Sequence, residues 1–90
     1  MESQLFVIRY YASVKKELRD IPQSIRARVI QKIQALAHDP YPVGVVKLSG
    51  ALQLYRIRSG DYRIIYEING SELLIVIVKI GHRREVYRQL

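Results

Sequence analysis

Three arginines in one short segment have the type and the spacing to hold phosphate. Arg56, Arg58 and Arg63 lie within Leu54–Tyr66, where two runs of alternating residues flank a Ser-Gly-Asp break. This pattern predicts a β-hairpin. Because side chains alternate between the faces of a strand, the three arginines share one face of the hairpin. A guanidinium group is planar, and its donors match the oxygens of a phosphate.

The hairpin loop leaves two registers open. A loop of Ser59 and Gly60 places Arg56 opposite Arg63, whereas a loop of Gly60 and Asp61 shifts the pairing by two positions in total. Both registers keep the same two faces. Unpaired guanidinium groups cannot be buried cheaply, so the sequence favours an anion site on the arginine side. The alternative is a solvated sheet face on which Glu67 and Asp61 neutralise the arginines. The opposite face is suited to burial and carries Tyr55, Ile57, Tyr62, Ile64 and Tyr66.

A second cluster follows the last apolar run of the chain. Histidine is the residue type best suited to proton transfer near neutral pH, so His82 is a candidate acid or base. Arg83 or Arg84 would neutralise charge at a reacting phosphate, and Tyr87 would stack on a base or donate a hydrogen bond. The alternatives are a strand-end hydrogen bond for His82 and an anchoring role for Tyr87. Lys47, in the loop that enters the hairpin, is a weaker candidate for binding phosphate.

The composition is that of one basic globular domain. Ninety residues form a single domain, residues 1–90, with one core. The net charge of +7 favours a polyanionic partner, either nucleic acid or an acidic protein, over a merely solvated basic surface. The chain has no cysteine, its two histidines are far apart, and it has no glycine-rich phosphate loop, so we expect no metal and no cofactor. No apolar run approaches membrane-spanning length, and we expect a cytoplasmic protein.

Hydrophobic periodicity predicts the elements that must position these residues. In chain order they are a strand over Gln4–Tyr10, helices over Tyr11–Asp20 and Pro22–His38, a loop over Pro40–Gly50, the hairpin, an apolar strand over Glu72–Ile80, and a stretch with room for a short helical turn, Glu85–Leu90. The order is β-α-α-β-β-β. We expect an α+β fold with two helices packed on one face of a four-stranded, antiparallel-type sheet.

The dipeptide Asn69-Gly70 is a strong turn signal and sets the predicted register of the last strand. A two-residue loop at this point places Arg63 opposite Val76. Even-numbered positions of the last strand then share the arginine side, and His82 is expected there too. A β-bulge between the two strands would invalidate this placement.

Taken in order, these segments resemble the RelE/ParE superfamily of bacterial toxins, and most closely its RelE branch. The resemblance covers the whole chain and is most specific over residues 47–87. It is carried by Lys47-Leu48-Ser49-Gly50, the hairpin Leu54–Tyr66, the apolar strand, and Gly81-His82-Arg83-Arg84-Glu85-Val86-Tyr87. It implies a small toxin of a type II toxin–antitoxin pair, which a cognate antitoxin protein holds inactive.

The resemblance also implies an activity. RelE-like toxins are endoribonucleases that cut mRNA in the ribosomal A site without a metal, with the 2′-hydroxyl as nucleophile. The implied partners are therefore mRNA on the ribosome and the surrounding ribosomal RNA. Arg63 stands where the family has a transition-state arginine. Arg83 or Arg84 matches a second phosphate-contacting arginine, and Tyr87 matches a functional tyrosine.

The chain departs from the RelE pattern at the proton acceptor. Arg56 and Arg58 stand where RelE nucleases have lysines, one of them the general base, and are expected to bind substrate. Arginine is a very poor base, since its pKa stays above about 12. Either His82 takes over proton transfer, or cleavage depends mainly on positioning and charge with the ribosome assisting.

Two other functions fit the sequence. A ParE-like toxin would block DNA gyrase through protein binding and would need no nuclease site. A non-toxic RNA-binding module would use the same basic surface. The Arg/His/Tyr cluster near the C-terminus favours the nuclease over both.

Overall fold

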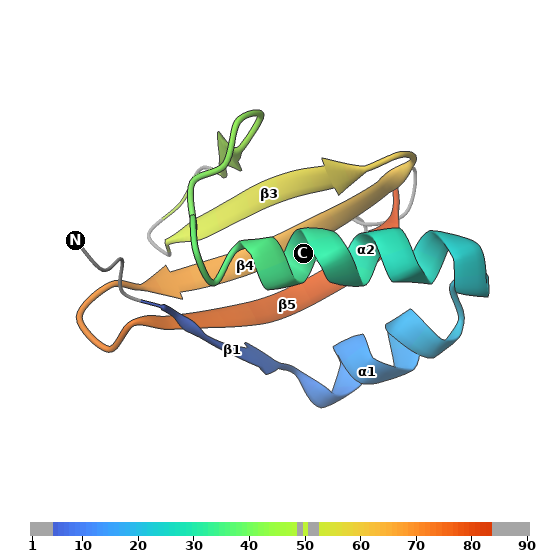
Figure 1. The fold of residues 1–90 in the computed structure, drawn as a ribbon, viewed down its shortest axis with the longest axis horizontal. Coiled ribbons are helices and arrows are strands. Elements are labelled where there is room, and N and C mark those ends of the chain that lie inside the picture. Colours follow the sequence, from blue (N-terminus) through green and yellow to red (C-terminus); the bar gives the residue numbers. More distant parts are fainter. Residues whose placement is uncertain (1–4, 49, 51–52, 84–90) are drawn as a thin grey trace.

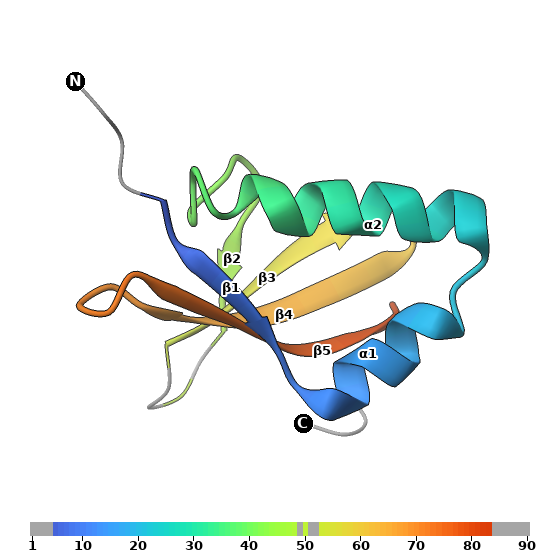
Figure 2. The same cartoon turned by 60° about the horizontal axis from the view of Figure 1, so that its bottom comes forward.

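The computed structural model describes residues 5–48, 50 and 53–83. Its elements are strand β1 (Val7–Tyr10), helices α1 (Ala12–Arg19) and α2 (Gln23–Ala35), and strands β2 (Val46–Lys47), β3 (Leu54–Ser59), β4 (Tyr62–Asn69) and β5 (Leu74–His82). Figures 1 and 2 show α2 running over one face of the sheet, with α1 beside the end of β5. The predicted α+β class is confirmed.

The sheet has five strands in the order β1-β5-β4-β3-β2, rather than the predicted four. The extra strand, β2, lies in the predicted loop over Pro40–Gly50, and two residues are too few to show an alternating pattern. The sheet is also mixed, because β1 pairs with β5 in parallel. The apolar strand β5 therefore has a paired strand along each edge, β1 on one side and β4 on the other.

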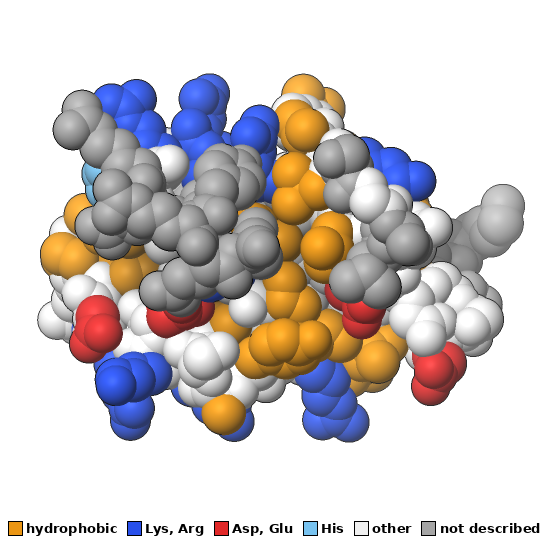
Figure 3. All heavy atoms as spheres, turned by 180° about the vertical axis from the view of Figure 1, so that it is seen from behind, with side chains coloured by type: hydrophobic (Ala, Val, Ile, Leu, Met, Phe, Trp, Pro, Cys, Tyr) orange, Lys and Arg blue, Asp and Glu red, His pale blue; other side chains and the backbone are white. Residues whose placement is uncertain are grey.

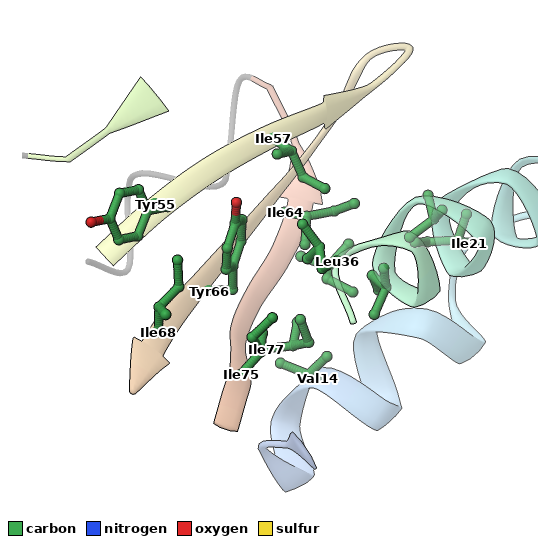
Figure 4. Close-up of a cluster of buried hydrophobic side chains, with 13 residues drawn as sticks. Val14, Ile21, Leu36, Tyr55, Ile57, Ile64, Tyr66, Ile68, Ile75 and Ile77 are labelled. Atoms are coloured by element: carbon green, nitrogen blue, oxygen red, sulfur yellow. The ribbon is translucent and has the colours of Figure 1, made fainter. Parts of the chain in front are cut away.

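One hydrophobic cluster joins both helices to strands β3, β4 and β5 (Figure 4). Val14 of α1 and Val29 and Ile33 of α2 are fully buried against it. Tyr66 is also fully buried, and its hydroxyl donates a hydrogen bond of 2.8 Å to the carbonyl of Pro40. Burial raises the pKa of Tyr66 above its usual value near 10. The sheet face turned toward the helices, called the helix face below, is therefore the core face of the sheet.

Helix α2 ends at Ala35, slightly before the predicted end at His38. The N–H groups of Leu36, Ala37 and His38 each donate to the carbonyl three residues earlier, at 3.0 to 3.1 Å. These bonds tighten the last turn into 3₁₀ geometry, which is common at a helix end. Of the described helices, neither has the length and apolar character needed to cross a membrane.

The register between β4 and β5 differs from the predicted one. Asn69 pairs with Leu74, so the connection spans residues 70–73 instead of two residues. The Asn69 side chain organises this longer turn, since its Oδ1 accepts hydrogen bonds from the backbone N–H of Glu72 at 3.0 Å and the hydroxyl of Ser71 at 2.9 Å. A four-residue turn preserves the parity of the pairing, so it does not by itself change which face a residue occupies.

A β-bulge does change the faces. Tyr66 pairs with Ile77, but its neighbour Ile65 pairs with Lys79, so Val78 is an extra residue in β5. Every residue after a one-residue bulge moves to the opposite face. The core reflects this shift, because Ile77 before the bulge and Ile80 after it both join the same buried cluster.

Candidate functional site

The hairpin of β3 and β4 carries the candidate site. Ser59 pairs with Tyr62, so the loop is Gly60-Asp61, the second of the two registers that the sequence allows. Gly60 has a φ of 59°, a left-handed conformation that glycine adopts without a steric penalty. The strand face turned away from α2 carries Arg56, Arg58 and Arg63 and is called the arginine face below. The predicted division of the hairpin into two faces is confirmed.

Two guanidinium-bearing residues face each other directly across the strands. Arg58 pairs with Arg63, and like charges directly opposite in a sheet are destabilising by roughly 0.2–1 kcal/mol. Arg58 is exposed, whereas Arg56 and Arg63 are half-buried. Arg63 donates from Nη1 to the carbonyl of Gly60 over 3.4 Å, which is a long hydrogen bond. This pairing of cations does little for stability and is suited to binding an anion.

Arg83 joins this group at the hairpin end. Its backbone N–H donates a hydrogen bond of 2.7 Å to the carbonyl of Asp61. Its Nε also lies 3.9 Å from Oδ1 of Asp61, with both side chains exposed, so the ion pair is weak and solvated. The backbone bond fixes the chain after β5 to the hairpin turn. Gly81, which has no side chain, is the partner of Arg63 on β5 and lies two residues before Arg83.

The surface view agrees with this placement. Figure 3 shows the side of the molecule turned away from α2, with Lys and Arg side chains along its upper edge, on the β3 side, and others along its lower edge. Apolar side chains lie between the two rows. The border of this face on the β3 side is therefore basic.

The prediction that His82 shares the arginine face is wrong. His82 pairs with Tyr62, whose side chain packs against the core cluster on the helix face. The two rings meet edge-on, with centroids 5.8 Å apart. Glu17 of α1 and Asp20, which directly follows that helix, line the same shallow cleft. The bulge after Tyr66 is the physical reason, because it reverses the parity on which the prediction depended.

Of the remaining predicted residues, Lys47 lies away from the arginine face. Lys47 pairs with Tyr55, so it has the parity of the helix face, and it is exposed. Arg84 and Tyr87 lie outside the described residues, and their roles stay predictions. Within the described part of the chain, no three His, Cys, Asp or Glu side chains form a group that could hold a metal ion.

The sequence indicated Asp61 as a partner of the strand arginines, but nothing in the pattern tied it to Arg83, which it contacts in the structure. Sequence reasoning also missed that Arg28 and Lys32 of α2 lie beside β3. The sequence shows that these two residues are four positions apart and lie off the apolar stripe of the helix. It does not show which strand this side of the helix meets.

Comparison with known proteins decides the family. A family model described as the ParE toxin of a type II toxin–antitoxin system matches residues 8–87. The chain belongs to this toxin family. The RelE/ParE resemblance seen in the sequence is thus confirmed, and the named relatives of the toxin place it in the RelE branch.

Two curated toxins and one solved structure are similar over most of their lengths. Toxin RelE3 of Methanocaldococcus jannaschii is 32% identical over 76 residues, covering 80% of this chain and 84% of the relative. Toxin RelG of Mycobacterium tuberculosis is 26% identical over 85 residues, covering 93% and 98%. The archaeal RelE–RelB complex from Pyrococcus horikoshii matches with a TM-score of 0.80 and 33% identity, covering 89% of this chain and 97% of that chain.

Proposed function

We propose that this toxin is a metal-independent, ribosome-dependent endoribonuclease that cuts mRNA in the A site. The observation that carries the proposal is the arginine face, on which Arg58 and Arg63 stand directly opposed and Arg83 is tied to the same hairpin end. Phosphate oxygens of an RNA backbone can neutralise both guanidinium groups at once and match their planar donors. The RelE-named relatives support the same activity.

The proposed reaction is an attack within the RNA. The 2′-hydroxyl loses its proton to solvent and bonds to the adjacent phosphorus. The bond from phosphorus to the 5′-oxygen breaks, which leaves a 2′,3′-cyclic phosphate and a 5′-hydroxyl that takes its proton from solvent. Negative charge builds up on the phosphate oxygens in the transition state. Arg63 and Arg83 donate to those oxygens, while Arg56 and Arg58 hold flanking phosphates. Removal of one such donor typically costs about 10²–10³ in rate.

Charge and positioning, rather than a histidine base, carry the reaction in this proposal. His82 faces α1 from the other side of the sheet, which separates its ring from the arginine face. Arginines remain protonated at neutral pH and cannot replace a lysine base. Between the two mechanisms that the sequence left open, the geometry supports the one without His82, with the ribosome positioning the substrate.

Toeprinting of translating ribosomes with added protein tests the activity. New mRNA ends in the A site, formed in the presence of a metal chelator that leaves the ribosomes assembled, are the expected result. Intact mRNA together with gyrase-linked DNA breaks would instead establish the ParE-like function. We place the toxin in the cytoplasm, where translating ribosomes are, and fractionation of expressing cells checks this.

The proposal includes a cognate antitoxin. The similar Pyrococcus horikoshii structure is a complex of RelE with RelB. A net charge of +7 and a basic arginine face suit an acidic or amphipathic antitoxin segment that folds onto the toxin and covers these arginines. A structure of the toxin with its genomic neighbour checks this. A complex that leaves Arg56 and Arg63 open in their active arrangement would contradict inhibition by coverage.

A further inference from the structure

A groove runs between helix α2 and the outer edge of strand β3. Strand β2 pairs with β3 only at Tyr55 and Arg56, so within the described residues Arg58 has no partner strand on its outer side. One part of the groove has a volume of about 480 Å³, and a more open hollow of about 600 Å³ continues it along α2 toward the hairpin turn. The groove follows α2 from Arg28 to Ala35, roughly 10 Å along the helix axis, and lies apart from the centre of the arginine face.

The charge of the groove has one sign. Arg28 and Lys32 line it from α2, and Arg56 and Arg58 line it from β3. None of its described lining residues is Asp or Glu. Arg28 and Lys32 are one helical turn apart, about 6 Å along the axis, and the two arginines are about 7 Å apart along the strand. Two rows of regularly spaced positive charge therefore line a groove open to solvent.

The lining favours phosphates over other anionic partners. It includes no aromatic side chain, so bases have nothing to stack on. Its apolar residues Leu36 and Ile57 are already buried in the core, and its exposed apolar side chains are only the small Ala35 on α2 and Val43 in the loop at one end. An amphipathic peptide would gain little from such a surface. Contacts to phosphate need only positive charge and donors, and they are independent of sequence.

We infer that this groove binds the backbone phosphates of a second RNA strand, separate from the strand on the arginine face. The inference rests on the proposed ribosome-dependent function, because a nuclease that works on the ribosome must dock on structured RNA as well as on its substrate. The two sites meet along β3, where the groove and the arginine face share Arg56 and Arg58. Docking in the groove would hold the arginine face in a fixed position over the strand to be cut.

The test removes the two groove cations that lie outside the reaction site. A double variant, Arg28→Ala with Lys32→Ala, changes two exposed residues of α2. The matched control, Lys15→Ala with Lys16→Ala, removes the same charge from exposed positions of α1. Alanine keeps helical propensity in both. Binding to purified ribosomes is measured over a salt series, and cleavage is measured in single turnover at saturating protein.

We expect the groove variant to bind ribosomes about tenfold or more weakly, as the loss of charge-assisted contacts predicts. The slope of log K against log salt should fall by about two relative to the control, one for each lost phosphate contact. Cleavage at saturation should equal that of the wild type. Equal affinity and equal slope in the groove and control variants would overturn the inference. The inference would also be overturned if the groove variant lost binding to a poly-glutamate probe but not to ribosomes, because the groove would then be a peptide site.

The outcomes separate the two proposals. If the wild type cuts mRNA and the groove variant binds as the control does, the nuclease stands and the groove inference falls. If the wild type binds ribosomes without cutting mRNA, and the groove and control variants still differ in their salt slope, the proposed nuclease activity is wrong and the groove remains an RNA site.

Discussion

Replacing Arg63 with alanine should remove toxicity without unfolding the protein. In the folded chain the Arg63 side chain makes one long hydrogen bond, 3.4 Å to the carbonyl of Gly60, worth at most about 1 kcal/mol. Its removal also relieves the repulsion from Arg58 directly opposite, which is worth roughly 0.2–1 kcal/mol. The two terms nearly cancel, so the free energy of unfolding should change by less than about 1 kcal/mol.

The effect on the reaction should be much larger. A lost transition-state donor costs about 3 kcal/mol, or roughly 150-fold in the rate of cleavage. Arg63→Lys keeps the charge but loses the planar pair of donors, and we expect an intermediate rate. Arg19→Ala, which removes an exposed arginine from the end of α1, is the matched control and should cleave normally.

Three measurements separate stability from chemistry for Arg63→Ala. Thermal unfolding reports the fold, single-turnover cleavage on programmed ribosomes reports the chemistry, and growth after induced expression reports toxicity. A well-expressed, folded Arg63→Ala protein that arrests growth and cuts mRNA at the wild-type rate would refute the assignment of the arginine face as the reaction site.

Three further predictions concern the helix side of the molecule. His82→Ala should leave the single-turnover rate and its pH profile unchanged, and a drop beyond about tenfold would contradict its placement away from the arginine face. Glu17→Ala should lower the free energy of unfolding by about 1–3 kcal/mol in denaturant titrations, because it leaves the N–H of Ile80 without its acceptor, whereas Glu17→Gln should cost less. Tyr66→Phe should cost about 1 kcal/mol through the lost bond to Pro40. Because the folded-state pKa of Tyr66 is raised, its contribution to stability is present below pH 10 and is lost as the pH rises further, so Tyr66→Phe should show a shallower alkaline loss of stability.

Local pattern was enough to predict the hairpin and its two faces. The alternation from Leu54 to Tyr66 depends on the period of a strand, which neighbouring residues alone determine. Either loop register preserved that alternation, so the grouping of Arg56, Arg58 and Arg63 did not depend on which one formed. The two helices followed from periodicity in the same way, with boundaries within a few residues. The family resemblance needed the same ordered segments and no tertiary information.

The placement of His82 could not be derived in this way. The face on which His82 lies depends on the register between β4 and β5 from the turn up to that residue. One extra residue, Val78, reverses it. A bulge forms where the core requires it. Here it lets Ile77 and Ile80 enter the same buried cluster although their sequence separation is odd. That requirement comes from the packing of helices against the sheet, which no local pattern records.

The parallel partner of β5 and the groove beside α2 depend on tertiary structure for the same reason. The residue types were visible in the sequence: an apolar strand that needs neighbours on both sides, and basic residues one turn apart on a helix. Which strand covers β5, and which strand the face with Arg28 and Lys32 meets, is set by long-range packing between segments far apart in the chain. The sequence therefore carried the chemistry of the arginines and the family of the toxin, since both depend on residue type and local order. The relative positions of its charged groups were decided by the fold, because they depend on how distant segments pack into one core.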